Sequence, residues 1–211
     1  MKKLLFTLAF ILPLIAIYSC SDDEDKNIYP DITLKVGEKY TIKDDYIGWK
    51  SDNELIAQIS GNVITARLAG NAHITNGENS FLVTVKPTNF LYEEPCVQWG
   101  SSQEYISQYM EKKGYKPLDN NDEEGQMYYG KSPVDYVIYA FKNGKLYSSG
   151  VYIPVSYAEE LSVFFAQRYV LISQANNTLS FTDPYKSIFI GMKPTIYNNK
   201  NYYIIAYGAK E

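Results

Sequence analysis

The C-terminal half of the chain repeats one pattern after 55 residues. A serine precedes a glutamate by three residues at Ser101–Glu104 and again at Ser156–Glu159, which is the signature of a capped helix start. Apolar residues follow each pair at helical spacing, first at Ile106, Tyr109 and Met110 and then at Leu161, Phe164 and Phe165. The pattern predicts two helices, the first of them ending at Gly114.

Four strands are predicted after each helix. They are expected at 115–118, 126–129, 134–141 and 145–153, and then at 169–173, 178–182, 186–192 and 202–207. The dipeptide Asn143-Gly144 between two of them is a strong hairpin signal. We therefore expect an α+β domain over 99–211, built from two helix-plus-four-strand repeats at 99–155 and 156–211 and preceded by a linker at 88–98.

Two such units side by side resemble the β-lactamase-inhibitor-protein-like architecture, in pattern and without a shared motif. Each helix is expected to bury its apolar stripe on one face of the sheet. The strand near residue 138 offers two alternating sets, one with Tyr136 and Ile138 and one with Val137 and Tyr139. The opposite face is expected to be free of helices, but both sets carry bulky residues, so both faces are expected to be partly covered or adhesive.

The preceding segment alternates with a period of two from Ile32 onward, and Gly, Asn and Asp separate its short strands. Five segments resemble, in the same order, the motifs of group 2 bacterial immunoglobulin-like domains. They are 32–42, Trp49–Ser51, 61–66, Ala69-Gly70 and 72–75. The resemblance covers 32–85 and implies an immunoglobulin-like domain at 31–87 that acts as a spacer or adhesion module. Trp49 is expected to fill the core between the sheets, and Gly70 to supply a turn with positive φ.

The fold class expected for the whole chain is an all-β immunoglobulin-like sandwich followed by the α+β domain. Strands are predicted at 32–36, 40–42, 47–49, 56–59, 63–66, 72–75 and 81–85. The segment after Thr75 is shorter than is usual for the immunoglobulin-like family, so one hairpin is expected to be trimmed.

The N-terminus reads as a targeting segment. Two lysines precede an apolar run of about 14 residues, which is shorter than the roughly 20 residues that a spanning helix needs. Ile17, Tyr18, Ser19 and Cys20 resemble the processing site of bacterial lipoproteins, although Tyr18 departs from the usual motif. The resemblance implies a signal peptide at 1–19 and lipidation of Cys20, hence a membrane partner through the lipid. The alternative is an ordinary signal peptide that is cut near Ser19.

An acidic tether is predicted at 20–30. Ser21–Asp25 resembles the signal that exports some lipoproteins to the outer face of the outer membrane. We therefore expect an outer-membrane location with exposure at the cell surface. A solvated tether on the periplasmic side of that membrane remains the alternative.

Charge and cysteine content exclude several classes of function. The net charge is −4 with no basic stripe, which argues against nucleic acid as a partner. Of two cysteines, Cys20 is assigned to lipid, so Cys96 is expected to be a buried, unpaired residue. The one histidine, His73, is expected on the surface of a strand.

No catalytic or metal motif is present in the sequence. The acidic loop from Asp119 fails as a calcium loop because its sixth and twelfth positions are Glu124 and Gly130. We therefore expect no catalytic residues, no metal and no cofactor, and we interpret the chain as a non-enzymatic protein.

Tyrosine is unusually common, with 21 in the chain. The candidate binding surface consists of the strand tyrosines Tyr128, Tyr129, Tyr136, Tyr139, Tyr147, Tyr152, Tyr202 and Tyr203. They are either half-buried core residues or an aromatic platform for a ligand. The functional hypothesis is adhesion or protein binding, and the alternative is glycan binding that assists polysaccharide uptake.

Overall fold

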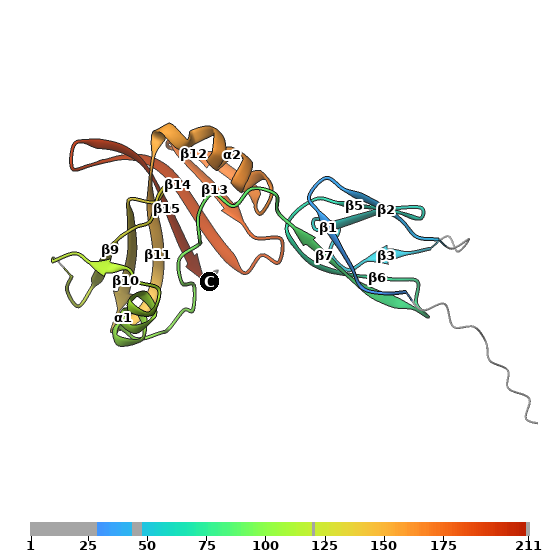
Figure 1. The fold of residues 1–211 in the computed structure, drawn as a ribbon, viewed down its shortest axis with the longest axis horizontal. Coiled ribbons are helices and arrows are strands. Elements are labelled where there is room, and N and C mark those ends of the chain that lie inside the picture. The colour runs from blue at the N-terminus through green and yellow to red at the C-terminus, as the bar shows by residue number, and fades with distance from the viewer. Residues whose placement is uncertain (1–28, 44–47, 120, 210–211) are drawn as a thin grey trace, which may run out of the picture.

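The structure is a computed structural model, and it describes residues 29–43, 48–119 and 121–209 (Figure 1). The predicted signal peptide 1–19, Cys20 and most of the acidic tether lie outside the described residues. Strands predominate, and the described part of the chain has two α-helices. With 10 and 9 residues, both helices are too short to cross a bilayer.

The N-terminal lobe consists of two sheets. Its strands are β1 Ile32–Lys35, β2 Lys39–Thr41, β3 Lys50–Ser51, β4 Ala57–Ser60, β5 Val63–Ala66, β6 Gly70–Thr75 and β7 Ser80–Lys86. One sheet has the order β1-β7-β6-β3, with β1 parallel to β7, and the other has the order β2-β5-β4. Inward-facing residues of both sheets form a single hydrophobic core.

Trp49 fills this core as predicted. Its side chain is 4% exposed and meets the rings of Tyr29 and Phe81 at centroid distances of 4.9 and 5.7 Å. It directly precedes β3, however, so the strand predicted at 47–49 is displaced; residues 44–47 lie outside the described part. Gly70 has φ +149° as predicted, and a Cβ there would lie 2.7 Å from Cδ1 of Ile56.

The C-terminal lobe is one eight-stranded antiparallel sheet with two helices. Its elements are α1 Gln103–Lys112, β8 Lys116–Pro117, β9 Gly125–Tyr129, β10 Tyr136–Lys142, β11 Lys145–Pro154, a 3₁₀ turn at Val155–Tyr157, α2 Ala158–Ala166, β12 Val170–Ala175, β13 Thr178–Thr182, β14 Ile188–Tyr197 and β15 Lys200–Ala209. The strand order is β12-β13-β14-β15-β11-β10-β9-β8. Each helix is thus followed by four strands, and the two sets of strands meet where β11 pairs with β15.

The two sets share the spacing of their helices and last strands, and each has an asparagine-containing turn before its last strand. The helices begin at residues 103 and 158, and the last strands run over 145–154 and 200–209, so both pairs are 55 residues apart. Asn143-Gly144 closes the β10–β11 hairpin with φ values of 52° and 68°, as predicted. At the matching place Asn198-Asn199 has φ values of 48° and 57° and closes the β14–β15 hairpin, a turn that was not among the predicted hairpins.

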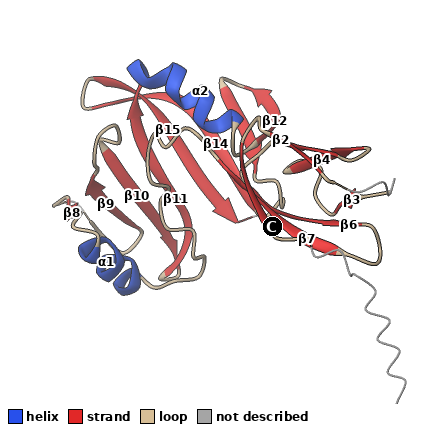
Figure 2. Cartoon of the chain, turned by 45° about the vertical axis from the view of Figure 1, so that its right-hand side comes forward, coloured by secondary structure: helices blue, strands red, loops and turns tan. Residues whose placement is uncertain are grey.

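Both helices pack on the same face of the sheet (Figure 2). Ile106 and Met110 of α1 and Leu161, Phe164 and Phe165 of α2 belong to one core. The cross-strand partners Val137, Val151 and Ile205 belong to the same core. Because alternate strand residues face opposite sides, their sequence neighbours lie on a face that no helix of the described residues covers.

The predicted capping boxes are wrong in detail. Ser102, not Ser101, caps α1, and its hydroxyl accepts a hydrogen bond from the backbone N–H of Tyr105 at 3.2 Å. The second helix has no side-chain cap, because a 3₁₀ turn leads into it and Tyr157 occupies the N-cap position. Gly114 follows the end of α1 with φ +75°, as predicted.

Replacing the two serines tests this correction. Ser102→Ala is expected to lower the free energy of unfolding by about 1 kcal/mol, because one helix N–H loses its acceptor. Ser156→Ala is expected to change it by less than about 0.5 kcal/mol, because no cap is lost. Urea denaturation of both variants provides the measurement, and equal losses would contradict the cap assignment.

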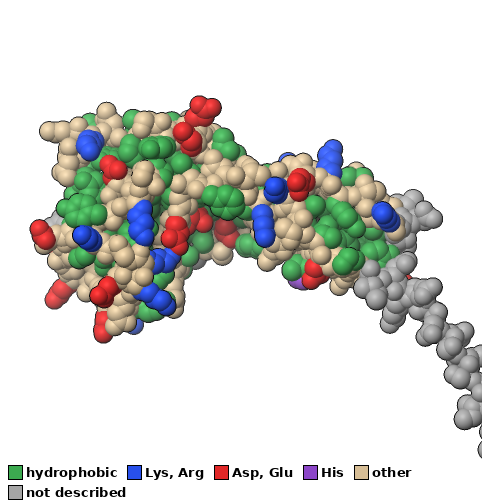
Figure 3. Space-filling view, viewed as in Figure 1, with side chains coloured by type: hydrophobic (Ala, Val, Ile, Leu, Met, Phe, Trp, Pro, Cys, Tyr) green, Lys and Arg blue, Asp and Glu red, His purple; other side chains and the backbone are tan. Residues whose placement is uncertain are grey.

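The two lobes contact each other (Figures 1 and 3), and hydrogen bonds there join β6 to the loop before β14. The Tyr185 hydroxyl accepts from the N–H of Asn71 at 2.6 Å and donates to its carbonyl at 3.2 Å. The N–H of Ala69 donates to the carbonyl of Gln167 at 2.8 Å. The Gln167 side chain in turn accepts a hydrogen bond from the backbone N–H of Thr88 in the connecting segment at 2.7 Å. The C-terminal end of α2 therefore forms hydrogen bonds with both the N-terminal lobe and the segment that connects the lobes.

Candidate functional site

The face of the large sheet opposite the helices, here called the open face, carries five tyrosines in mutual contact. We call Tyr129, Tyr136, Tyr152, Tyr197 and Tyr202 the tyrosine cluster. The ring of Tyr136 lies 5.1 to 6.2 Å from the centroids of the other four rings. These separations are within the range of favourable aromatic pairs. The cluster is therefore a continuous aromatic patch.

Strand register brings these residues together. Tyr129, Tyr136 and Tyr152 are direct cross-strand partners on β9, β10 and β11. Tyr202 of β15 pairs with Pro154 at the end of β11. Tyr197 comes from the far end of β14, and its hydroxyl lies 3.7 Å from the sulfur of Met127 on β9. The hairpin of β14 and β15 thus closes one end of the cluster.

The cluster has a buried base and an exposed rim. Tyr202 is 1% exposed, and its hydroxyl donates to Oδ2 of Asp135 at 2.8 Å. Burial first, and then the Asp135 carboxylate, raise the pKa of Tyr202. Burial, with Tyr197 nearby, also raises the pKa of Tyr152. Both hydroxyls therefore stay protonated at neutral pH, while Tyr129 at the rim is 55% exposed.

A hollow lies beside the cluster on the same sheet. It has a volume of about 260 Å³ and is bounded by Met127, Ile138, Ala140 and the loop at Asn121-Asp122. Next to Ile138 in the sheet is Gly150, where a Cβ would lie 2.7 Å from the carbonyl oxygen of Ile205. The open face thus carries a hollow at β9 and β10 next to the tyrosine cluster.

Four of the eight predicted surface tyrosines belong to the cluster, namely Tyr129, Tyr136, Tyr152 and Tyr202. Tyr147 is 54% exposed and lies apart from it, at the bulge between β10 and β11. The other three are on the helix-covered side because of strand alternation. Tyr128 and Tyr139 are 3% and 2% exposed and pack edge to face at 6.1 Å, and Tyr203 packs against the core.

The prediction missed Tyr197. Its strand was expected to end at residue 192, whereas β14 continues to Tyr197. The signal that could have identified it is the sequence Tyr197-Asn-Asn-Lys200, a two-residue hairpin turn between strand residues. Extending the strand to this turn places Tyr197 on the same face as Thr195, the cross-strand partner of Tyr202.

The residues considered for chemistry lie apart from the cluster. His73 is exposed and its Nδ1 is 3.2 Å from a carboxylate oxygen of Asp52. Cys96 is buried, as expected, and its backbone N–H donates to the hydroxyl of Tyr139 at 3.2 Å. In the acidic loop, Oδ1 of Asp122 accepts from the N–H groups of Glu124 and Gly125. Within the described ranges, no three His, Cys, Asp or Glu side chains are grouped to hold a metal ion.

Comparison with known proteins gives no relative of this chain. Protein-family models, curated proteins and solved structures were each searched, and none matches.

Proposed function

We propose that this chain is a non-enzymatic binding protein whose tyrosine cluster contacts a protein partner. The observation that carries the proposal is the contact of five tyrosine rings on a sheet face that neither helix covers. Apolar patches that reach the surface, as this one does at Tyr129, mark interaction sites. Tyrosine is enriched at protein interfaces because it combines a large apolar ring with a polar hydroxyl.

The arrangement of the cluster suits binding. Ring contacts and the hydrogen bond from Tyr202 to Asp135 hold the rings in place before a partner arrives. A surface that is already ordered loses little side-chain entropy on binding. The neighbouring hollow of about 260 Å³ would accept one projecting side chain of the partner. An apolar anchor in such a hollow is the usual centre of an interface.

The rest of the chain is proposed to display this surface. In this view the N-terminal lobe is an immunoglobulin-like spacer of the bacterial group 2 type, and its two sheets around Trp49 support that assignment. The C-terminal lobe is a duplicated helix-plus-four-strand unit, which the 55-residue offset of helices and last strands supports. Lipidation of Cys20 would attach the protein to the outer membrane, with the open face available at the cell surface.

Two matched variants test the binding proposal. Tyr129 and Tyr147 are almost equally exposed, at 55% and 54%, but only Tyr129 belongs to the cluster. Tyr129→Ala is expected to weaken retention of the protein partner at least about tenfold, as loss of an aromatic anchor does. Tyr147→Ala is expected to leave retention unchanged.

The assay compares the two variants with the unaltered mature chain on proteins from native cells and on a panel of polysaccharides. Retention of one protein that depends on Tyr129 supports the proposal. Retention of a polysaccharide with the same dependence would establish the glycan alternative instead. Equal behaviour of Tyr129→Ala and Tyr147→Ala would exclude the tyrosine cluster as the binding surface.

A further inference from the structure

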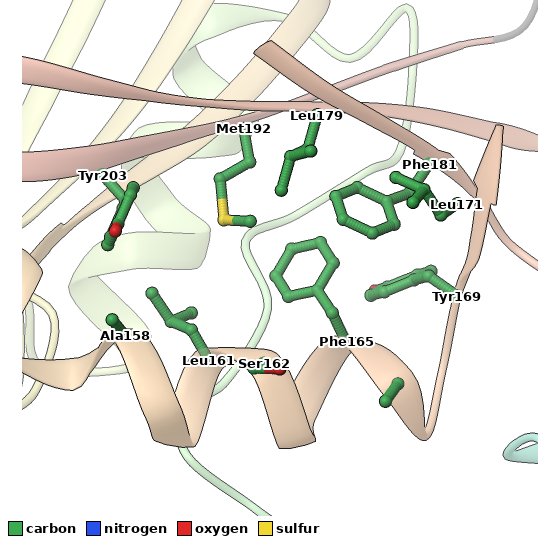
Figure 4. A pocket seen from close by; sticks show the side chains of 11 residues that line it. Ala158, Leu161, Ser162, Phe165, Tyr169, Leu171, Leu179, Phe181, Met192 and Tyr203 are labelled. Atoms are coloured by element: carbon green, nitrogen blue, oxygen red, sulfur yellow. The ribbon is translucent and has the colours of Figure 1, made fainter. Parts of the chain in front are cut away.

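A second hollow lies on the other side of the sheet, between α2 and strands β13–β15. Figure 4 shows it bordered by Leu161 and Phe165 of the helix and by Leu179, Phe181, Met192 and Tyr203 of the sheet. We call it the α2 slot. Its volume is about 400 Å³, which is within the range of pockets that hold small organic ligands.

The equivalent space under α1 is filled. The hollow there measures only about 10 Å³, and it is lined by Tyr109 and Met110 of α1, by Val137 and Tyr139 of the sheet and by the connecting segment at Glu93–Pro95. Val137 beneath α1 and Met192 beneath α2 are 55 residues apart and line the two spaces. The same architecture is therefore compatible with close packing, and the opening under α2 is a property of its particular side chains.

The lining of the α2 slot excludes a charged occupant. None of its side chains carries a charge, and an ion transferred there would lose its water without gaining a partner. The polar groups at the slot include the hydroxyls of Ser162, which is exposed, and of Tyr203, which is half-buried. The slot therefore suits an apolar group that ends in a hydrogen-bonding atom.

The slot is elongated along α2. Its helix side extends from Ala158 to Ala166, which corresponds to about 12 Å along the axis. The ring of Phe165 lines the slot and lies 4.6 Å from that of Phe181 and 5.2 Å from that of Tyr169. An unbranched chain fits this shape better than a wide ring system.

We infer that the α2 slot binds the alkyl chain of an uncharged amphiphile, with its polar end near Ser162 and Tyr203. Apolar side chains of the helix and sheet remove the alkyl chain from water. This site is separate from the tyrosine cluster, which lies on the opposite face of the sheet, so either proposal can fail without the other.

Three methionines provide a direct test with 1-octanol as the probe. Met192 lines the slot, Met110 lies in the filled space under α1, and Met127 lies beside the tyrosine cluster. The mature chain with Cys20→Ser, which carries no acyl group, is labelled with ¹³C at the methionine methyls. The expected result is a saturable shift of the Met192 signal, with Met110 and Met127 unmoved. An unmoved Met192, or a common non-saturating shift of all three signals, would overturn the inference.

Adjacent positions on α2 give the matched variants. Ser162 lines the slot, whereas Val163 is 43% exposed and does not. Ser162→Trp is expected to weaken octanol binding at least about tenfold by filling the slot, and Val163→Trp to leave it within about twofold. Unchanged Met110 and Met127 signals establish that each variant is folded. Equal octanol affinity of the two variants would contradict the site.

Discussion

Raising the pH above about 10 is expected to unfold the C-terminal lobe, because its buried tyrosines cannot ionise in place. Tyr139, Tyr202 and Tyr207 are 2%, 1% and 1% exposed. Burial is the main cause that raises the pKa of each of them. The unfolded chain, with tyrosine pKa values near 10, releases these protons more readily.

The direction of the change in stability with pH follows from the linkage between proton binding and folding. A group whose pKa is raised by folding stabilises the native state below its unfolded pKa, and this stabilisation is lost as the pH rises toward the folded pKa. Each tyrosine then lowers the free energy of unfolding by about 1.4 kcal/mol per pH unit. The three together lower it by about 4 kcal/mol per pH unit. Against a usual total stability of about 5–15 kcal/mol, unfolding is expected by about pH 12.

Absorbance at 295 nm and circular dichroism, followed together from pH 8 to 13, measure this effect. The buried tyrosines are expected to ionise in one step that coincides with loss of the sheet signal. Tyr207→Phe is expected to reduce the number of protons released on unfolding by about one. Tyr147→Phe is expected to leave this number unchanged, since Tyr147 is 54% exposed. Smooth ionisation of all tyrosines near pH 10 with the fold intact would contradict the burial argument.

The second large effect is expected from Phe164→Ala. Phe164 is fully buried, stacks on Tyr92 at a centroid distance of 4.4 Å and has the Arg168 guanidinium 3.8 Å from its ring centre. Arg168 also donates to the carbonyl of Asn89 at 2.6 Å. Removing this ring leaves a cavity and frees the connecting segment that Tyr92 and Asn89 belong to. The expected loss is about 4 kcal/mol.

Tyr109 of α1 provides the matched control, 55 residues earlier on the equivalent helix face. It is only half-buried, so Tyr109→Ala is expected to lower the free energy of unfolding by about 2 kcal/mol. Urea denaturation followed by Trp99 fluorescence, in a Trp49→Phe background, reports on the C-terminal lobe alone. A loss for Phe164→Ala no larger than that for Tyr109→Ala would contradict the role assigned to Phe164.

Local pattern predicted most of the strands and both helices. The strand expected at 178–182 is β13, and the repeated apolar spacing identified the buried residues of α1 and α2. These elements were predictable because burial of one face imposes a period of two on strands and of 3.6 on helices. Because both halves of the lobe follow these periods, the 55-residue offset between them can be recognised in the sequence without comparison to a related protein.

Several features were not predictable from that pattern. Strand alternation separates Tyr128 from Tyr129 onto opposite faces, and the choice of covered face depends on where the helices pack. The helix caps depend on the conformation of one residue, which in α2 is altered by a preceding 3₁₀ turn. The α2 slot arises because the side chains around Met192 leave a space of about 400 Å³, whereas the hollow beside α1 that Tyr139 lines measures only about 10 Å³. Such differences in side-chain packing do not produce a periodic pattern in the sequence, so they cannot be predicted from one.

The central claim is that the open face meets a partner, and site-specific cross-linking tests it most directly. Lys193 lies on the open face, paired with Ile204 beside Tyr152, and Lys112 lies on α1; both are exposed. A photo-reactive benzoylphenylalanine at position 193, in native cells, is expected to give one discrete cross-linked protein that disappears with Tyr129→Ala. The same group at position 112 is expected to give none. No product from position 193, or the same products from both positions, would contradict the account.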